Sequence, residues 1–324
     1  MNAPMTLPSL SDIERARERV RAVLVHTPML PLDLDLTAGR DIRIKCENLQ
    51  RTGSFKIRGA FNRIAGLSDE QRARGVIAYS SGNHAQGVAC AASLLGVRAT
   101  VVMPENAIAA KVAATRRFGA EVLFAGTDSE TRRRRAEELA AERGLALVPP
   151  YDHPEIIAGQ GTLGLEILEQ APEVRAVFVP IGGGGLVSGV ALAIKALQPE
   201  ARVIGVEPEG AADAAASRKA GHVVALERTE TIADGLRALK VGALPFEAIR
   251  VWVDDVVTVS DEAILETTRL LPRRLRVVAE PSGAVALAAA LATAGDGCSV
   301  AVISGGNIDT DLLRTLLNGD GEIL

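Results

Sequence analysis

The chain has 324 residues, of which 48% are hydrophobic and 23% are charged, and its formal net charge is −4. This length allows one large or two moderate globular domains, and the charge argues against nucleic acid as a main partner. Cys46, Cys90 and Cys298 lie far apart in the sequence, which argues against a disulfide framework or a zinc site. Without a signal-like N-terminus or an apolar run long enough for a membrane span, we expect a cytoplasmic protein that does not enter a membrane.

The first elements predicted along the chain are a helix over 11–24 and a strand over 42–46. Ser11 is placed to cap the helix, with Glu14 three residues further on, and apolar residues recur at helical spacing. The segment 42–46 alternates between apolar and polar side chains, as a half-buried strand does.

From residue 76 onward, strands and helices alternate with short connections. Strands are predicted at 76–80, 99–103, 121–125 and 146–148, and helices at 84–95, 107–118 and 129–143. This alternation indicates a parallel sheet with right-handed crossovers.

Adjacent prolines, Pro149 and Pro150, interrupt the pattern and predict a boundary, because proline disfavours helix interiors and central strands. After this boundary, helices are predicted at 162–170, 186–197, 261–271 and 282–293, and strands at 174–180, 202–207 and 299–304. We therefore predict an α/β protein with two lobes and a ligand site in the cleft between them.

Three glycine-containing turns lie where α/β proteins bind ligands, at strand ends and helix starts. The turn 80–87 can present backbone N–H groups to an anion such as a substrate carboxylate, or can simply cap a helix. The four glycines at 182–185 can fold around one phosphate or act as a hinge, and they fit neither the P-loop nor the full dinucleotide fingerprint. At 304–307, Ser304 can bond a heteroaromatic nitrogen or belong to a plain strand-end turn.

Lys56 lies among apolar residues in the segment 53–60. On its own it resembles a surface lysine with a buried stem. The functional alternative is a desolvated amine with a lowered pKa, which can attack an aldehyde. A lysine for an aldehyde, a glycine loop for a phosphate, a helix start for a carboxylate and a hydroxyl for a ring nitrogen together match pyridoxal 5′-phosphate (PLP) and an amino acid.

The sequence resembles the fold-type-II PLP enzymes, in particular the serine/threonine dehydratase and serine racemase family. The matching segments, in the family's order, are Ser54–Ala60, Ser80–His84, Ala158–Thr162, Gly182–Leu186, Glu280–Gly283 and Ser304–Asn307. The resemblance implies a tryptophan synthase β-like fold, with parallel sheets flanked by helices and the cofactor in the interdomain cleft. It also implies a homodimer, a large PLP-binding domain of residues 1–70 and 151–324, and a small substrate-closing domain of residues 71–150.

The resemblance further implies that Lys56 carries PLP covalently and later removes the substrate Cα proton. The other implied cofactor contacts are Phe55 on the ring, Asn83 at the ring hydroxyl, Ser304 at the pyridine nitrogen, and Gly182, Gly183, Gly184, Gly185 and Leu186 at the phosphate. A hydroxyl at position 304, in place of a carboxylate, would not strongly hold the ring protonated. The residues implied around the substrate carboxylate are Ser80, Ser81, Gly82, Asn83 and His84.

The implied reaction is loss of water and ammonia from a small β-hydroxy amino acid such as L-threonine or L-serine, which leaves a 2-oxo acid. A racemase is an alternative, because Ser81 matches the position that faces Cα opposite the lysine, although Tyr151 replaces the Asn of animal racemases. Arg132, the first of four consecutive arginines, either lies on a solvated helix face or pairs with a substrate carboxylate, which would favour 3-hydroxyaspartate. A 3-phenylserine dehydratase is a further alternative.

The segment 207–213 resembles the family's divalent-cation loop. The implied ligands are the carboxylates of Glu207 and Asp213 and the carbonyl of Ala211. A set made only of oxygens suits Mg²⁺ or Ca²⁺, and the alternative is a solvated acidic turn.

Overall fold

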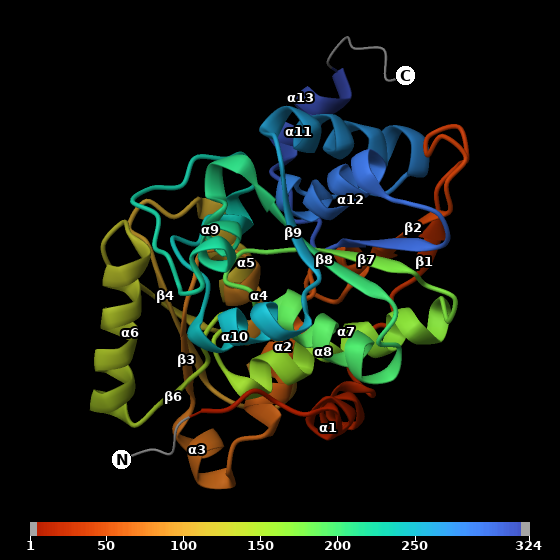
Figure 1. Ribbon diagram of the computed structural model, residues 1–324. Helices are drawn as coiled ribbons and strands as arrows, with labels where there is room; N and C mark the ends of the chain where they lie inside the picture. The colour runs from red at the N-terminus through yellow and green to blue at the C-terminus, as the bar shows by residue number, and fades with distance from the viewer. Residues whose placement is uncertain (1–4, 319–324) are drawn as a thin grey trace.

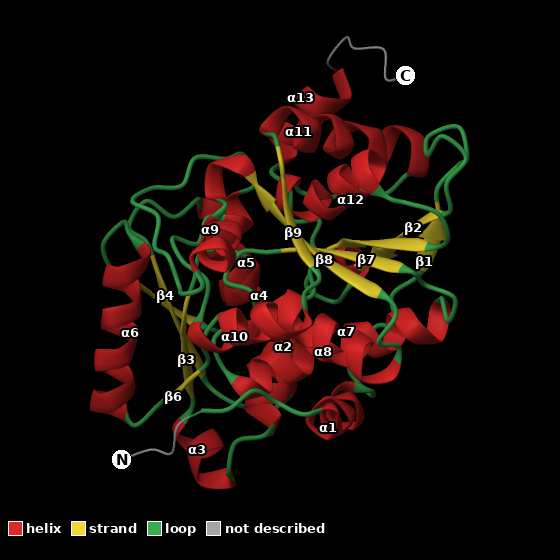
Figure 2. Ribbon diagram, viewed as in Figure 1, coloured by secondary structure: helices red, strands yellow, loops and turns green. Residues whose placement is uncertain are grey.

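The computed structural model describes residues 5–318 and contains two mainly parallel β-sheets flanked by helices (Figures 1 and 2). The strands are β1 (Met29–Pro31), β2 (Ile42–Cys46), β3 (Val76–Tyr79), β4 (Ala99–Met103), β5 (Glu121–Phe124), β6 (Ala146–Leu147), β7 (Ala176–Pro180), β8 (Arg202–Pro208), β9 (Asp255–Val259) and β10 (Ser299–Ile303). The α-helices are α1 (Leu10–Val20), α2 (Lys56–Ala65), α3 (Asp69–Arg74), α4 (Asn83–Leu94), α5 (Ala109–Arg116), α6 (Ser129–Arg143), α7 (Pro154–Gln170), α8 (Gly185–Leu197), α9 (Asp213–Ala220), α10 (Ala243–Trp252), α11 (Asp261–Leu270), α12 (Pro281–Thr293) and α13 (Thr310–Asn318).

The larger sheet has six strands in the order β1-β2-β10-β7-β8-β9. Only β1, at the edge, pairs antiparallel to its neighbour. Helices α11 and α12 cover one face, while α7, α8 and α10 lie on the other (Figure 2). Strand β10 is buried along its whole length, as expected for a strand covered by helices on both faces.

The smaller sheet has four parallel strands in the order β5-β4-β3-β6. Helix α6 packs on one face, where Ala136 and Leu139 meet Ile77 and Val102. Helices α4 and α5 pack on the other face. The predicted fold class, α/β with parallel sheets flanked by helices, is therefore confirmed.

Helix α2 packs both against the core beside the smaller sheet and against a helix of the larger sheet. Its apolar side chains Ile57, Phe61 and Ile64 belong to the core beside the smaller sheet, and the helix also packs against α7. All four strands of the smaller sheet lie within residues 76–147. The division into a domain of residues 71–150 and a domain formed by the remaining residues stays a prediction.

Several predicted helix starts differ from the structure by one or two residues or more, and two of the differences have a clear physical cause. Helix α1 begins at Leu10 because Ser9 caps it, and Ser9 and Asp12 form a reciprocal capping box two residues before the predicted one. Helix α7 begins at Pro154, eight residues before the predicted start at 162. Proline was interpreted only as a breaker, yet its missing N–H and fixed φ suit the first helical position.

No helix within residues 5–318 is long and apolar enough to cross a membrane. The three cysteines are free and buried.

Candidate active site

Lys56 is the first residue of α2, and its side chain points at the segment that follows β6. Its Nζ donates a hydrogen bond to the carbonyl oxygen of Pro150 at 3.0 Å and lies 5.1 Å from the centroid of the Phe55 ring. Burial lowers the pKa of this amine to about 8. A neutral, nucleophilic amine is therefore accessible close to neutral pH.

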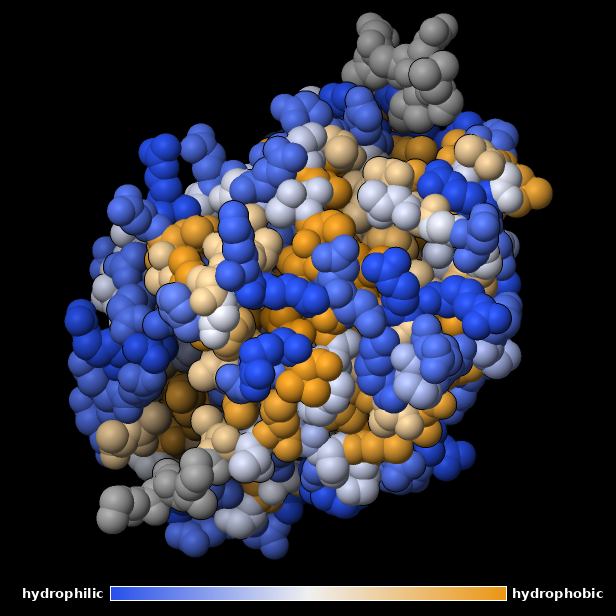
Figure 3. All heavy atoms as spheres, viewed as in Figure 1, coloured by the Kyte–Doolittle hydropathy of each residue, from blue (hydrophilic) through white to orange (hydrophobic). Residues whose placement is uncertain are grey.

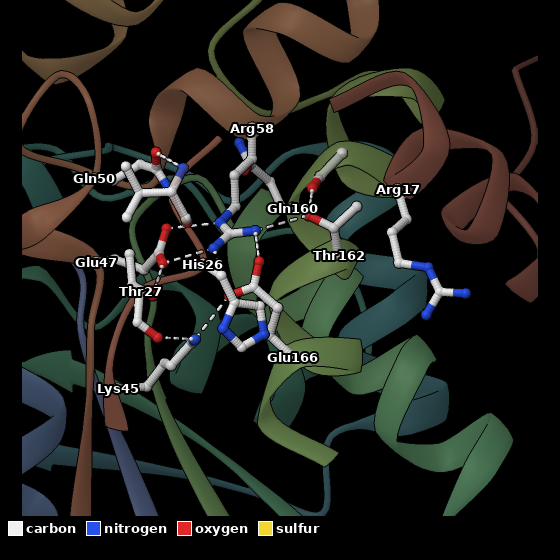
Figure 4. A network of polar contacts seen from close by, with 12 residues as sticks. Arg17, His26, Thr27, Lys45, Glu47, Gln50, Arg58, Gln160, Thr162 and Glu166 are labelled. Atoms are coloured by element: carbon white, nitrogen blue, oxygen red, sulfur yellow. Dashed lines mark hydrogen bonds and ion pairs between the residues drawn. The ribbon is translucent and has the colours of Figure 1, made fainter. Parts of the chain in front are cut away.

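A buried network of charged side chains holds the first turn of α2 in place through Arg58, two residues after Lys56 (Figure 4). The guanidinium of Arg58 lies 2.7 Å from carboxylate oxygens of both Glu47 and Glu166. The ammonium of Lys45 lies 2.7 Å from a second oxygen of Glu166. Two cations thus balance two carboxylates, and α2 is tied to α7 and to the end of β2.

The tetraglycine loop lies between β7 and α8. Gly184 has φ +89°, which favours glycine, and a Cβ on Gly183 would lie 2.1 Å from the ring of Tyr151. Because α8 begins at Gly185, backbone N–H groups of its first turn lack helical partners and suit an anion. The loop therefore fits a phosphate, and Leu186, whose side chain is buried, could contribute only its backbone.

The strand-end turn 304–307 lies beside the lysine segment. The carbonyl of Ser304 accepts a hydrogen bond from the backbone N–H of Phe55 at 3.1 Å, and Gly305 pairs with Ser54. The Ser304 hydroxyl lies 3.3 Å from the carbonyl oxygen of Ser282. The structure thus brings together Phe55, Lys56 and Ser304, three residues predicted to face one cofactor.

Glu280 supports Asn83, a role that the sequence analysis missed. The Asn83 amide nitrogen donates to Glu280 at 2.5 Å, and the Asn83 oxygen accepts from the side chain of Asn307 at 2.7 Å. Burial raises the pKa of Glu280 to about 7. The sequence offered one signal for this role, because Glu280 lies inside a family motif directly before a predicted helix. Its partner Asn83, however, lies 197 residues away in the sequence.

The turn predicted to bind a carboxylate joins β3 to α4. The backbone N–H of Gly82 donates to the Ser80 hydroxyl at 3.2 Å, and α4 begins at Asn83 with free N–H groups in its first turn. Within residues 5–318, the Ser81 hydroxyl has no hydrogen-bond partner.

His84 is held with a defined proton position. Its Nε2 lies 2.9 Å from the carbonyl oxygen of Val148, and because a carbonyl only accepts, Nε2 carries the proton. Burial, together with the charge of Lys56, lowers the pKa of His84 to about 3. The ring is therefore neutral and its Nδ1 is an acceptor, so only the backbone of His84 can donate to a carboxylate.

Arg132 differs from Arg133 and Arg135, two other arginines of its run. Arg133 and Arg135 form ion pairs with glutamates of α6, and the surface in this region is largely hydrophilic (Figure 3). The guanidinium of Arg132 donates to the Thr127 carbonyl and the Ser129 hydroxyl. Its Nε is buried without a partner, and desolvation lowers its pKa. None of its contacts in the described chain is with the turn 80–84.

The predicted cation ligands form a buried acidic pair. Both carboxylate oxygens of Glu207 accept backbone hydrogen bonds, from Ala214 at 2.9 Å and from Ala215 at 2.8 Å. Both oxygens of Asp213 are buried without a partner, and Ala211 is the buried residue of the turn between the two acids. Burial raises the pKa of Glu207 to about 8 and that of Asp213 to about 7. Two neighbouring buried carboxyls, one of them orphaned, fit a hard divalent cation.

Comparison with known proteins gives consistent matches over nearly the whole chain. The family model described as "Pyridoxal-phosphate dependent enzyme" matches residues 20–305. An L-threo-3-hydroxyaspartate ammonia-lyase of Saccharomyces cerevisiae is 45% identical, over 97% of this chain and 98% of the relative. An L-threonine ammonia-lyase of Thermotoga maritima is 45% identical, over 96% of this chain and 78% of the relative. Maize serine racemase superposes with a TM-score of 0.91 at 41% identity, over 95% of this chain and 96% of that structure.

Proposed function

Because this chain belongs to the pyridoxal-phosphate dependent enzymes, within their ammonia-lyase and dehydratase family, we propose that it converts a 3-hydroxy amino acid to a 2-oxo acid and ammonia. The observation that carries this proposal is the buried amine of Lys56, whose pKa is lowered. The same chain has a glycine loop, 182–185, whose backbone can bind a phosphate.

PLP, when bound, withdraws electrons from the substrate Cα and makes its proton acidic. Lys56 would carry the cofactor, the loop 182–185 would hold its phosphate, and Asn83 and Ser304 would bind its ring. With a pKa of about 8, the Lys56 amine is suited to accept the Cα proton near neutral pH. The backbone N–H groups at the start of α4 would hold the substrate carboxylate.

We favour L-threo-3-hydroxyaspartate as the first substrate to test. Arg132 is a partly desolvated cation that, within the described chain, donates to a carbonyl and a hydroxyl and to no carboxylate, and its Nε has no partner. A second substrate carboxylate would supply one, and Arg suits this role through its fork of donors. The similarity to the yeast relative of that name supports the choice. L-Threonine and L-serine are the next candidates, supported by the Thermotoga relative.

A panel of substrates tests both the lyase activity and the role of Arg132. We expect the wild type to form 2-oxo acid from 3-hydroxyaspartate. Arg132→Met should lower kcat/KM on 3-hydroxyaspartate by about tenfold to a hundredfold, the range of a lost charge-assisted hydrogen bond. The same variant should change kcat/KM on L-serine little. Arg133→Met, which removes only exposed ion pairs with Glu130 and Glu137, is the matched control. Equal losses on both substrates would refute the role of Arg132, and no oxo acid from any 3-hydroxy amino acid would refute the lyase.

Racemisation is the second candidate function. The Ser81 hydroxyl is uncommitted within the described chain and lies in the turn that would hold the substrate, which would allow it to exchange a proton opposite Lys56. The same panel, scored for exchange of enantiomers, decides the matter. If exchange is faster than oxo-acid formation on every substrate, the enzyme is a racemase first.

A further inference from the structure

The connecting segment, residues 148–152, joins β6 of the smaller sheet to α7 beside the larger sheet. Its carbonyl groups accept hydrogen bonds from two predicted site residues, Val148 from His84 at 2.9 Å and Pro150 from Lys56 at 3.0 Å. A displacement of this segment would therefore move the acceptors of both residues.

Tyr151, within the connecting segment, packs directly on the tetraglycine loop. A Cβ on Gly183 would lie 2.1 Å from its ring, and a Cβ on Gly185 would lie 3.0 Å from its Cα and Cβ atoms. No side chain fits at either position while Tyr151 stays in place. The conformation of the loop and the position of Tyr151 therefore depend on each other.

Asp152 anchors the connecting segment to α10. One carboxylate oxygen accepts from the backbone N–H of Ala243 at 2.9 Å, and the other accepts from Leu244 at 3.0 Å. The residue before the helix, Gly242, donates its backbone N–H to the carbonyl of Gly183 at 3.1 Å. A carboxylate at a helix N-terminus is favoured both by its hydrogen bonds and by the helix dipole. The start of α10 is thus tied to the connecting segment on one side and to the tetraglycine loop on the other.

We propose that Asp152 is a positioning residue of the active site, which fixes the start of α10 and thereby holds Tyr151 against the tetraglycine loop and the Pro150 carbonyl against Lys56. Without its carboxylate, two backbone donors of α10 lose their partner, and the connecting segment loses its polar anchor on this side. The loop then loses the support that keeps its N–H groups in place. This inference rests on the proposed function only in that the loop is taken to bind the cofactor phosphate.

The test compares Asp152→Ala and Asp152→Asn with Ser68→Ala in the full-length protein. Ser68 also caps a helix, α3, which has no buried residues, so its loss reproduces the general cost of a missing cap. After removal of bound cofactor, each variant is titrated with PLP and with pyridoxal, which lacks the phosphate. Amide hydrogen exchange at 182–186 and 243–246 is measured in the same samples.

We expect Asp152→Ala to lower the affinity for PLP relative to pyridoxal by about fivefold to tenfold, the range of a lost helix cap, and to speed exchange in both segments. Asp152→Asn keeps one acceptor, so its affinity for PLP relative to pyridoxal should lie within about threefold of the wild-type value. Ser68→Ala should match the wild type. If Asp152→Ala leaves exchange at 182–186 unchanged, or weakens PLP and pyridoxal equally, the positioning role is wrong. If the wild type binds neither compound, the proposed function fails, while the exchange measurement still decides the role of Asp152. Should the alanine variant not fold, Asp152→Leu, which also removes both acceptors, takes its place with the same expected losses.

Discussion

Replacing Arg58 with methionine tests the buried charged network. Arg58 and Glu47 are fully buried, and Arg58 donates five hydrogen bonds, two to Glu47, two to Glu166 and one to Thr162. After the substitution, Glu166 keeps Lys45, but among residues 5–318 Glu47 keeps only the hydroxyl of Thr27 as a side-chain partner. Breaking a buried pair on one side costs about 3–5 kcal/mol, a large part of a typical unfolding free energy of about 5–15 kcal/mol.

The assay is urea unfolding of four proteins: wild type, Arg58→Met, Glu47→Gln and the double variant. We expect the double variant to be less destabilised than the sum of the single variants, because it leaves no unpaired charge at this pair. Arg133→Met, at an exposed pair, should change the unfolding free energy by less than about 1 kcal/mol. A cost below about 1 kcal/mol for Arg58→Met, or simple additivity in the double variant, would refute the reasoning.

Three further predictions concern the cofactor loop, the cation pair and Glu280. Gly184→Ala should destabilise the fold by at least about 1–2 kcal/mol and weaken PLP binding, because φ is +89° and a Cβ would lie 2.7 Å from the side chain of Pro245. Gly82→Ala, with open space around its Cβ, should leave stability nearly unchanged in the same melts. Mg²⁺ should raise the melting temperature and Asp213→Asn should abolish that rise; an equal rise in the variant would contradict the cation site. The folded-state pKa of Glu280, about 7, exceeds its unfolded value, so unfolding releases a proton and stability falls as pH rises from about 4.5 to 7. Glu280→Gln should flatten this part of the pH profile in urea unfolding, and an unchanged slope would contradict the assignment.

The sequence predicted the elements whose signals are local. The alternation of strands and helices after residue 76 predicted the strands of the smaller sheet. The glycine turns were recognised at strand ends because a buried parallel strand is an apolar run that ends where polar residues begin. The start of α7 was missed because Pro154 was interpreted as a breaker, although the proline stands at the first position of the helix. Local patterns carry this ambiguity wherever one residue type both ends and begins helices.

The contacts that support the site could not be predicted, because they join distant parts of the chain. Lys56 and the Pro150 carbonyl are 94 residues apart, and Asp152 caps a helix 91 residues away. The glycines at 183 and 185 were interpreted as phosphate ligands, with a flexible hinge as the alternative. The structure gives them a second reason, since the ring of Tyr151 occupies the space of a side chain at 183, and the Cα and Cβ atoms of Tyr151 crowd one at 185.

Every step of the proposed reaction depends on Lys56 carrying the cofactor. The most direct test is borohydride reduction of the purified, PLP-loaded protein, followed by digestion and mass spectrometry of the peptide that contains residue 56. We predict a stable phosphopyridoxyl adduct on Lys56, and none on this peptide in Lys56→Ala. An adduct on another lysine, or an unmodified Lys56 in a protein that forms 2-oxo acid, would contradict the account.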